Sequence, residues 1–140
     1  VGYHKGINSE GTTLFEAKKF SNESGVDAMA ISVGNTHLQT SKIAKIDYNK
    51  IKQIEKVSDI PLVLHGSSGI SYNLRKKIAR NTKVAKFNIG TELRMIAGES
   101  LKDNIKKNKK NFDRLQLIKP TIKNIKNATM KVIKNIGPKK

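Results

Sequence analysis

Three short apolar segments, separated by stretches with helical periodicity, constrain the fold of this chain more than any other feature. They cover residues 26–34 (VDAMAISVG), 60–66 (IPLVLHG) and 84–90 (VAKFNIG). Nearly continuous apolar runs of this length are typical of strands that are buried on both faces of a parallel sheet. The helical stretches between them provide the long crossover connections that parallel strands require. The sequence therefore predicts an α/β protein with a parallel sheet.

Capping residues indicate where the intervening helices begin. Thr13 and Glu16 have the spacing of a capping box, and the helix that they start is expected to end near residue 24. Asp47 and Ser71 stand directly before the next two helical stretches, and both residue types are favoured N-caps. A fourth helix is expected from about Thr91.

The last helix is expected to start at Pro120, because proline is favoured at the first helical position. The basic residues 106–115 before it are interpreted as a solvated connection. Its lysines are expected to face water. The apolar residues expected to face the sheet are Ile122, Ile125, Val132 and Ile133.

The charge of the chain is strongly basic, with a formal net charge of +17. Lysine supplies most of it, with 24 Lys against 4 Arg, whereas base-reading sites favour arginine. Residues 101–140 alone hold 13 basic and 2 acidic residues, which fits a solvated helical surface. We therefore expect no specific nucleic-acid partner, and the short apolar runs indicate no membrane partner.

The absence of cysteine excludes several classes of site at once. A chain with 0 Cys has no disulfide framework, no thiolate zinc site and no cysteine nucleophile. A cytoplasmic location is the corresponding expectation.

Polar residues follow each predicted strand at its carboxyl end. His37 follows the first strand, His65 and the Gly-Ser-Ser-Gly of residues 66–69 follow the second, and Asn88 and Thr91 follow the third. Carboxyl ends of parallel strands lie on one edge of a sheet, where α/β proteins place their active sites. Two histidines on that edge suit a metal ion, and a glycine-rich turn before a helix suits a phosphate.

Each of these residues also has a purely structural interpretation. A histidine after a strand is often a hydrogen-bond partner, Gly-Ser-Ser-Gly often forms a turn, and Asn88 is of a type that ties down loops. Their shared placement favours the functional interpretation. His4 has no such context and is predicted to be a loop histidine.

The segments VDAMAISVGNTH, PLVLHGSSGI and VAKFNIGTEL, in this order and spacing, closely resemble the class II (metal-dependent) ketose-bisphosphate aldolases. The similarity covers nearly all of residues 1–140. It implies the C-terminal part of a TIM (β/α)8 barrel, namely strands six to eight with their helices, within one domain and without a separate second domain.

The resemblance also implies roles for individual residues. One catalytic Zn²⁺ and a monovalent cation are the cofactors that it implies. Asn88 is the residue expected to contact the reacting ketose. The zinc ligands expected are His37 and His65, and the residues expected to bind the substrate phosphate are Gly66, Ser68, Gly69, Gly90 and Thr91.

The implied reaction is the reversible aldol cleavage of a ketose bisphosphate to dihydroxyacetone phosphate and an aldehyde phosphate. The chain departs from the family pattern at Leu38, Ser67 and Gly90, where the family commonly has Gly, Gly and, in the fructose-bisphosphate enzymes, often Asp. These differences leave open whether the sugar is fructose-1,6-bisphosphate or tagatose-1,6-bisphosphate.

The family's general-base Asp, a further zinc-binding His and a Glu near the metal have no counterpart in these residues. We therefore expect the C-terminal half of an aldolase that is inactive alone and whose full-length form is a homo-oligomer. The alternative is a non-catalytic basic half-barrel that binds polyanions or a partner chain.

Overall fold

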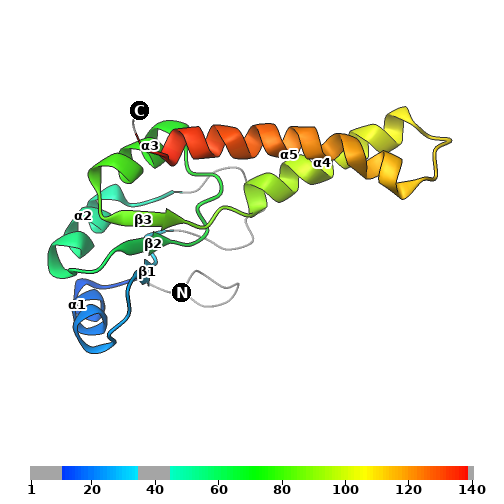
Figure 1. The fold of residues 1–140 in the computed structure, drawn as a ribbon. Coiled ribbons are helices and arrows are strands. Elements are labelled where there is room, and N and C mark those ends of the chain that lie inside the picture. Colours follow the sequence, from blue (N-terminus) through cyan, green and yellow to red (C-terminus); the bar gives the residue numbers. More distant parts are fainter. Residues whose placement is uncertain (1–10, 35–44, 139–140) are drawn as a thin grey trace. The chain divides into compact units, whose positions relative to one another are not determined.

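The computed structural model describes residues 11–34 and 45–138 (Figure 1). Within the chain, residues 1–89 and 90–140 form two compact units. Each unit is described by itself below. That residues 1–140 belong to one barrel domain stays a prediction.

The first unit alternates helices and strands as predicted (Figure 1). Its elements are α1 (Leu14–Glu23), β1 (Met29–Ile31), α2 (Tyr48–Val57), β2 (Leu62–Leu64), α3 (Tyr72–Asn81) and β3 (Val84–Phe87). The strands form a parallel sheet in the order β1-β2-β3, in which Met29 pairs with Leu62 and Leu62 with Val84. Each strand lies inside one of the predicted apolar segments and is shorter than that segment.

The predicted helix caps are confirmed by their hydrogen bonds. The amide of Glu16 donates to Oγ1 of Thr13 over 3.2 Å, and the amide of Thr13 donates to the Glu16 carboxylate over 2.9 Å, which completes the capping box. Asp47 accepts from the amide of Lys50, and Ser71 caps α3 in the same way. These local interactions set the starts of α1, α2 and α3.

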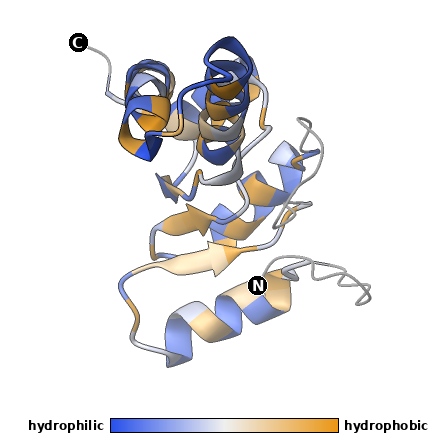
Figure 2. Ribbon diagram, turned by 90° about the vertical axis from the view of Figure 1, so that its right-hand side faces the viewer, coloured by the Kyte–Doolittle hydropathy of each residue, from blue (hydrophilic) through white to orange (hydrophobic). Residues whose placement is uncertain are grey.

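The core of the first unit lies on one face of the sheet. Alternate strand residues are fully or almost fully buried there, and the helices contribute Ala17, Ile51, Ile54 and Ile78 to the same cluster. On the other face Ala30 and Ala85 are exposed and Val63 is half-buried. The expectation of strands buried on both faces is therefore wrong for this structure. Figure 2 shows the apolar strands beside helices in which hydrophobic and hydrophilic residues alternate.

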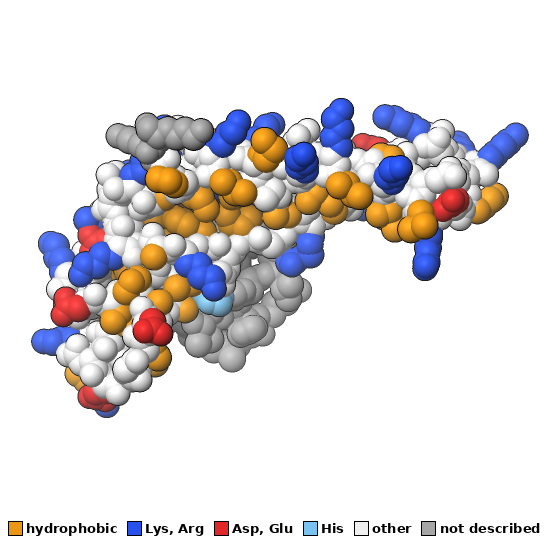
Figure 3. All heavy atoms as spheres, viewed as in Figure 1, with side chains coloured by type: hydrophobic (Ala, Val, Ile, Leu, Met, Phe, Trp, Pro, Cys, Tyr) orange, Lys and Arg blue, Asp and Glu red, His pale blue; other side chains and the backbone are white. Residues whose placement is uncertain are grey.

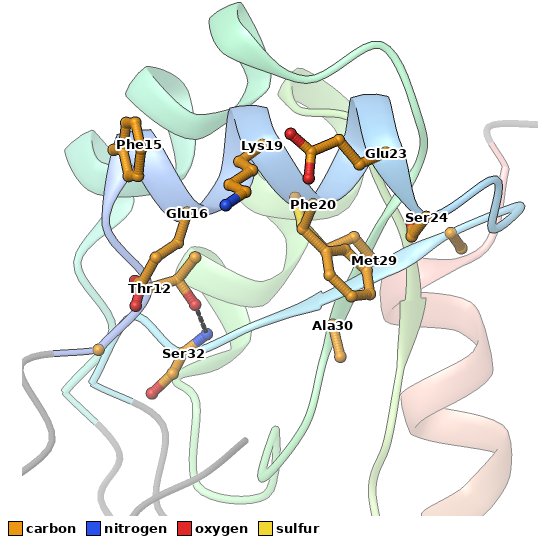
Figure 4. A pocket seen from close by; sticks show the side chains of 12 residues that line it. Thr12, Phe15, Glu16, Lys19, Phe20, Glu23, Ser24, Met29, Ala30 and Ser32 are labelled. Carbon is orange, nitrogen blue, oxygen red and sulfur yellow. Dashed lines mark hydrogen bonds between the residues drawn. The ribbon is translucent and has the colours of Figure 1, made fainter.

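Among residues 11–34 and 45–138, no strand pairs with the outer edge of β1, and a groove lies along this edge beside α1. The amide of Met29 donates to the carbonyl of Pro61 over 2.9 Å. Because successive amides of a strand point to opposite edges, the amide of Ala30 points away from β2. At the end of β1, two hydrogen bonds of 2.8 Å join Thr12 and Ser32, and Figure 4 marks the one from the Ser32 amide to the Thr12 hydroxyl. The groove has a volume of about 720 Å³, and the exposed Phe15 and half-exposed Phe20 line it. An open strand edge beside apolar side chains favours association with another chain.

The second unit consists of two antiparallel helices, α4 (Thr91–Lys107) and α5 (Arg114–Ile136). The prediction that the last helix begins at Pro120 is wrong, because α5 begins six residues earlier. Asp113 caps it by accepting from the amide of Leu115 over 2.8 Å. Only residues 108–113 of the predicted connection are non-helical.

Pro120 lies inside α5, where its missing N–H leaves the carbonyl of Gln116 without its helical donor. Asn104 of α4 donates its side-chain amide to Gln116 over 3.4 Å and to Leu117 over 2.6 Å. A neighbouring helix thus supplies the donor that proline lacks. This contact explains how α5 continues through a proline.

The face of α5 that is buried differs from the predicted one. Ile122 and Ile133 are 61% and 59% exposed, so the expectation that they face inward is wrong, whereas Val132 is buried. Thr121 and Asn135 share the buried face with Val132. Figure 3 shows exposed apolar side chains between projecting Lys and Arg side chains along this unit. No helix in the described part of the chain is long and apolar enough to span a membrane.

Removing part of the core should destabilise the first unit. Ile54 is 0% exposed, so we expect Ile54→Ala to lower the free energy of unfolding by about 2–5 kcal/mol. Phe15 is 76% exposed, so Phe15→Ala should change it by only about 0.5 kcal/mol. Urea denaturation followed by circular dichroism measures both. Equal losses for the two variants would contradict the burial of Ile54 in the core and the exposure of Phe15.

The open edge of β1 should make the purified chain self-associate. Lysine on an edge strand hinders pairing with another strand. We therefore expect Ala30→Lys to reduce the sedimentation coefficient and to sharpen the thermal transition. Asn73→Lys, on the exposed surface of α3, adds the same charge elsewhere and should have neither effect. A wild-type chain that is monomeric with a sharp two-state transition would refute this prediction.

Candidate functional site

The predicted phosphate loop connects β2 to α3 in the first unit. It begins at His65, directly after β2, and reaches Ser71, the N-cap of α3. Gly66 and Gly69 have φ values of 57° and 81°. Residues with side chains adopt this left-handed region at a cost, so both turns favour glycine. The spacing of the two glycines therefore determines the shape of the loop.

Ser67 fastens this loop to the ends of two strands. Its side chain is fully buried and donates from Oγ to the carbonyl of Leu64 over 2.7 Å. Its amide donates to the carbonyl of Asn88 over 3.1 Å, and the amide of Asn88 donates to Leu64 over 2.9 Å. Ser67, which stands where the resembled family commonly has glycine, therefore has a structural role in this loop.

His65 and Asn88 lie together although they are 23 residues apart. The Asn88 side-chain nitrogen is 3.3 Å from both ring nitrogens of His65. An amide nitrogen is a donor, so it can donate only to a ring nitrogen that carries no proton. Both side chains are half-buried. The structure therefore brings the predicted ketose-contacting residue next to one predicted zinc ligand.

The other predicted zinc ligand, His37, lies outside the described residues, as do Leu38 and His4. Among residues 11–34 and 45–138, no three His, Cys, Asp or Glu side chains lie close enough together to hold a metal ion. A catalytic zinc site takes three protein ligands. The described residues therefore do not complete such a site, and of the two predicted ligands they include only His65.

The loop has the chemistry of an anion site. Ser68 is 5% exposed and stands between the two turns made by Gly66 and Gly69. The first helical turn of α3 follows at once. Successive backbone amides at a tight turn before a helix attract anions, and a hydroxyl adds one more donor.

Gly90 and Thr91 begin α4 and belong to the second unit. The Thr91 hydroxyl accepts from Nη2 of Arg94 over 3.0 Å. The guanidinium lies against Gly90, where a Cβ atom would approach Nη1 to 2.9 Å. Arg94 is not among the residues predicted from the sequence motifs. One signal in the sequence could have identified it. Arg94 is a basic residue in the first turn of a helix, three residues after a threonine that is predicted to bind phosphate.

The comparison with protein families agrees with these arrangements. Residues 2–140 match the family described as fructose-bisphosphate aldolase class-II. The chain belongs to this family. The match covers almost the entire chain, so the resemblance predicted from the three strand motifs is confirmed.

Two solved structures are similar to this member of the class II aldolases. The YdjI aldolase from Escherichia coli K12 is 28% identical with a TM-score of 0.71, and the match covers 90% of this chain and 44% of that one. A putative fructose-1,6-biphosphate aldolase from Coccidioides immitis is 21% identical with a TM-score of 0.63, and the match covers 89% of this chain and 42% of that one. The chain thus spans less than half the length of either.

These similarities support the predicted fold in its coarser form. The small parallel sheet with its helices is consistent with a fragment of a TIM barrel. The numbering of the strands as six to eight stays a prediction.

The hydrogen bond from Ser67 to Leu64 predicts a measurable effect on stability. Ser67→Ala should lower the free energy of unfolding by about 1 kcal/mol, the usual net value of one hydrogen bond. Ser21→Ala, a helix serine bonded only to a carbonyl one turn earlier, should be nearly neutral. Urea denaturation at neutral pH compares the two. An unaffected Ser67→Ala would mean that the hydroxyl does not fasten the loop.

Proposed function

We propose that this chain is the phosphate-binding half of a zinc-dependent ketose-bisphosphate aldolase. The enzyme would cleave fructose-1,6-bisphosphate or tagatose-1,6-bisphosphate reversibly to dihydroxyacetone phosphate and an aldehyde phosphate. Membership of the class II aldolase family supports the reaction class. The observation that carries the proposal is the direct connection of the Gly66–Gly69 loop to Asn88 through the amide of Ser67.

The loop would bind the phosphate of the dihydroxyacetone-phosphate half of the substrate. Ser68 and the amides of Gly66 and Gly69 are the donors that we assign to it. Because the loop and Asn88 are joined by a hydrogen bond, a phosphate held in the loop would place the ketose beside the Asn88 side chain. Orientation of this kind lowers the entropic part of the barrier.

Thr91 is assigned to the same phosphate group, as the resemblance implies. Arg94 adds a guanidinium that already donates to the Thr91 hydroxyl. Gly90 is assigned to the phosphate on the same resemblance, and its missing side chain leaves room for the Arg94 guanidinium within the second unit.

Zinc dependence is part of the proposal because the family is generally zinc-dependent. His65 would be one ligand and His37 a second. A monovalent cation near the phosphate is proposed on the same basis. The described residues do not complete the zinc site, so the general base and at least one more metal ligand would come from the rest of the barrel.

The 140-residue chain should therefore bind the phosphorylated product without catalysing the reaction. Coupled assays with both bisphosphates at saturating zinc should show turnover far below the roughly 10 s⁻¹ of a typical enzyme. Dihydroxyacetone phosphate should bind, and Ser68→Ala should weaken its binding by about tenfold, the loss expected for a hydrogen bond to a charged group. Isothermal titration calorimetry measures this affinity.

Ser21→Ala serves as the control variant and should bind as the wild type does. Turnover within tenfold of a typical enzyme would contradict the missing-half interpretation. Tighter binding of a polyanion such as heparin than of dihydroxyacetone phosphate at physiological salt would favour the alternative of a basic polyanion-binding chain. That alternative draws on α5, whose charged residues are all basic.

A further inference from the structure

A buried arginine stands next to the phosphate loop. Arg75 lies in the first turn of α3 and is only 5% exposed. Arginine is rarely buried to this extent, because its charge always remains and must leave water. The burial of a positive charge at residue 75 therefore indicates that Arg75 has a specific role in this part of the structure.

The guanidinium of Arg75 holds the end of the loop. Its Nη2 donates to the carbonyl of Ile70 over 3.0 Å, and Ile70 follows Gly69 and is itself buried. The peptide unit is planar, so the amide of Ser71 points away from the guanidinium. The hydrogen bond thus fixes the orientation of the last peptide unit between the loop and α3.

The loop is consequently held at both ends. Ser67 ties its start to Leu64 and Asn88, and Arg75 ties its end to the body of α3. The two glycines between them make the loop easy to deform, because glycine has many accessible backbone conformations. A loop that binds an anion through backbone amides depends on such supports to keep the amides in place.

The charge of Arg75 acts in the same direction as its hydrogen bond. A charge that is removed from water is weakly screened and acts more strongly on its surroundings than one on the surface. Arg75 therefore adds positive charge beside Ile70, at the end of the loop where the phosphate of the proposed function would bind.

We propose that Arg75 is a positioning residue of the phosphate loop, which orients the Gly69–Ser71 turn and supplies a buried positive charge beside it. The proposal rests on the proposed phosphate site and adds a residue that none of the sequence motifs contains. The ligand concerned is a phosphate monoester dianion or inorganic phosphate.

Arg75→Met tests this role because it keeps an unbranched side chain but removes the donor and the charge. The probe is radiolabelled inorganic phosphate in equilibrium dialysis with the full chain, which works whatever the state of association. Arg80→Met is the matched control, since it removes the same charge from the same helix at a half-buried residue. We expect Arg75→Met to weaken phosphate binding by at least about tenfold and Arg80→Met by less than about twofold.

Salt dependence and a conservative variant separate this role from general stabilisation. Phosphate binding should decline less steeply with salt in Arg75→Met than in the wild type, because one attracting charge is gone. Arg75→Lys keeps the charge but loses the planar guanidinium with its paired donors. Its affinity for phosphate should lie between those of the wild type and Arg75→Met. If Arg75→Met does not fold, Arg75→Lys carries the test, with a loss of about threefold or more expected.

The outcomes distinguish this inference from the proposed function. Two results would overturn the role of Arg75 alone, provided that Ser68→Ala still weakens phosphate binding. One is equal phosphate affinity of Arg75→Met and Arg80→Met. The other is an Arg75→Lys chain that binds phosphate as tightly as the wild type. A wild-type chain that binds neither phosphate nor dihydroxyacetone phosphate would overturn both.

Discussion

The carbonyl of Leu64 is the point on which the candidate site depends. It accepts the amide of Asn88 over 2.9 Å and the hydroxyl of Ser67 over 2.7 Å. The first bond extends the pairing of β2 and β3 beyond the strands, and the second turns the chain into the loop. One acceptor at the carboxyl end of the central strand therefore links Asn88, the predicted ketose-contacting residue, to the loop that is proposed to bind phosphate. Without parallel pairing of the two strands, the bond from Asn88 to Leu64 would not form.

The one-sided burial of the sheet fits this arrangement. Helices cover the face that contains Met29, Ile31 and Leu64, whereas Ala30 on the other face is exposed. In a closed barrel the inward-pointing residues of all strands fill a shared interior. The three strands in the described part of this chain are too few to enclose such an interior. Val63 and the exposed Lys86, which are partners in the pairing of β2 with β3, share this open face with Ala30.

The second unit shows where local rules are not sufficient. Proline at position 120 favours a helix start, and that rule is sound for an isolated helix. In the structure, Asn104 supplies a donor to the carbonyl groups of Gln116 and Leu117, and Asp113 caps the helix earlier. Asn104 is 12 and 13 residues away from these carbonyl groups in the sequence, so rules based on neighbouring residues cannot predict the contact. Packing of two helices thus overrides the preference of one residue.

The sequence by itself determined the alternation of helices and strands, the caps at Thr13, Asp47 and Ser71, and the polar residues that follow each strand. These features depend on neighbours a few residues apart, such as the hydrogen bond between Thr13 and Glu16. Its strand motifs also identified the family. Only the tertiary structure placed Asn88 beside His65 and decided which face of α5 is buried. It also decided the burial of Arg75 under the end of the loop. Contacts of this kind join residues from different elements, and their geometry exists only after strands pair and helices pack.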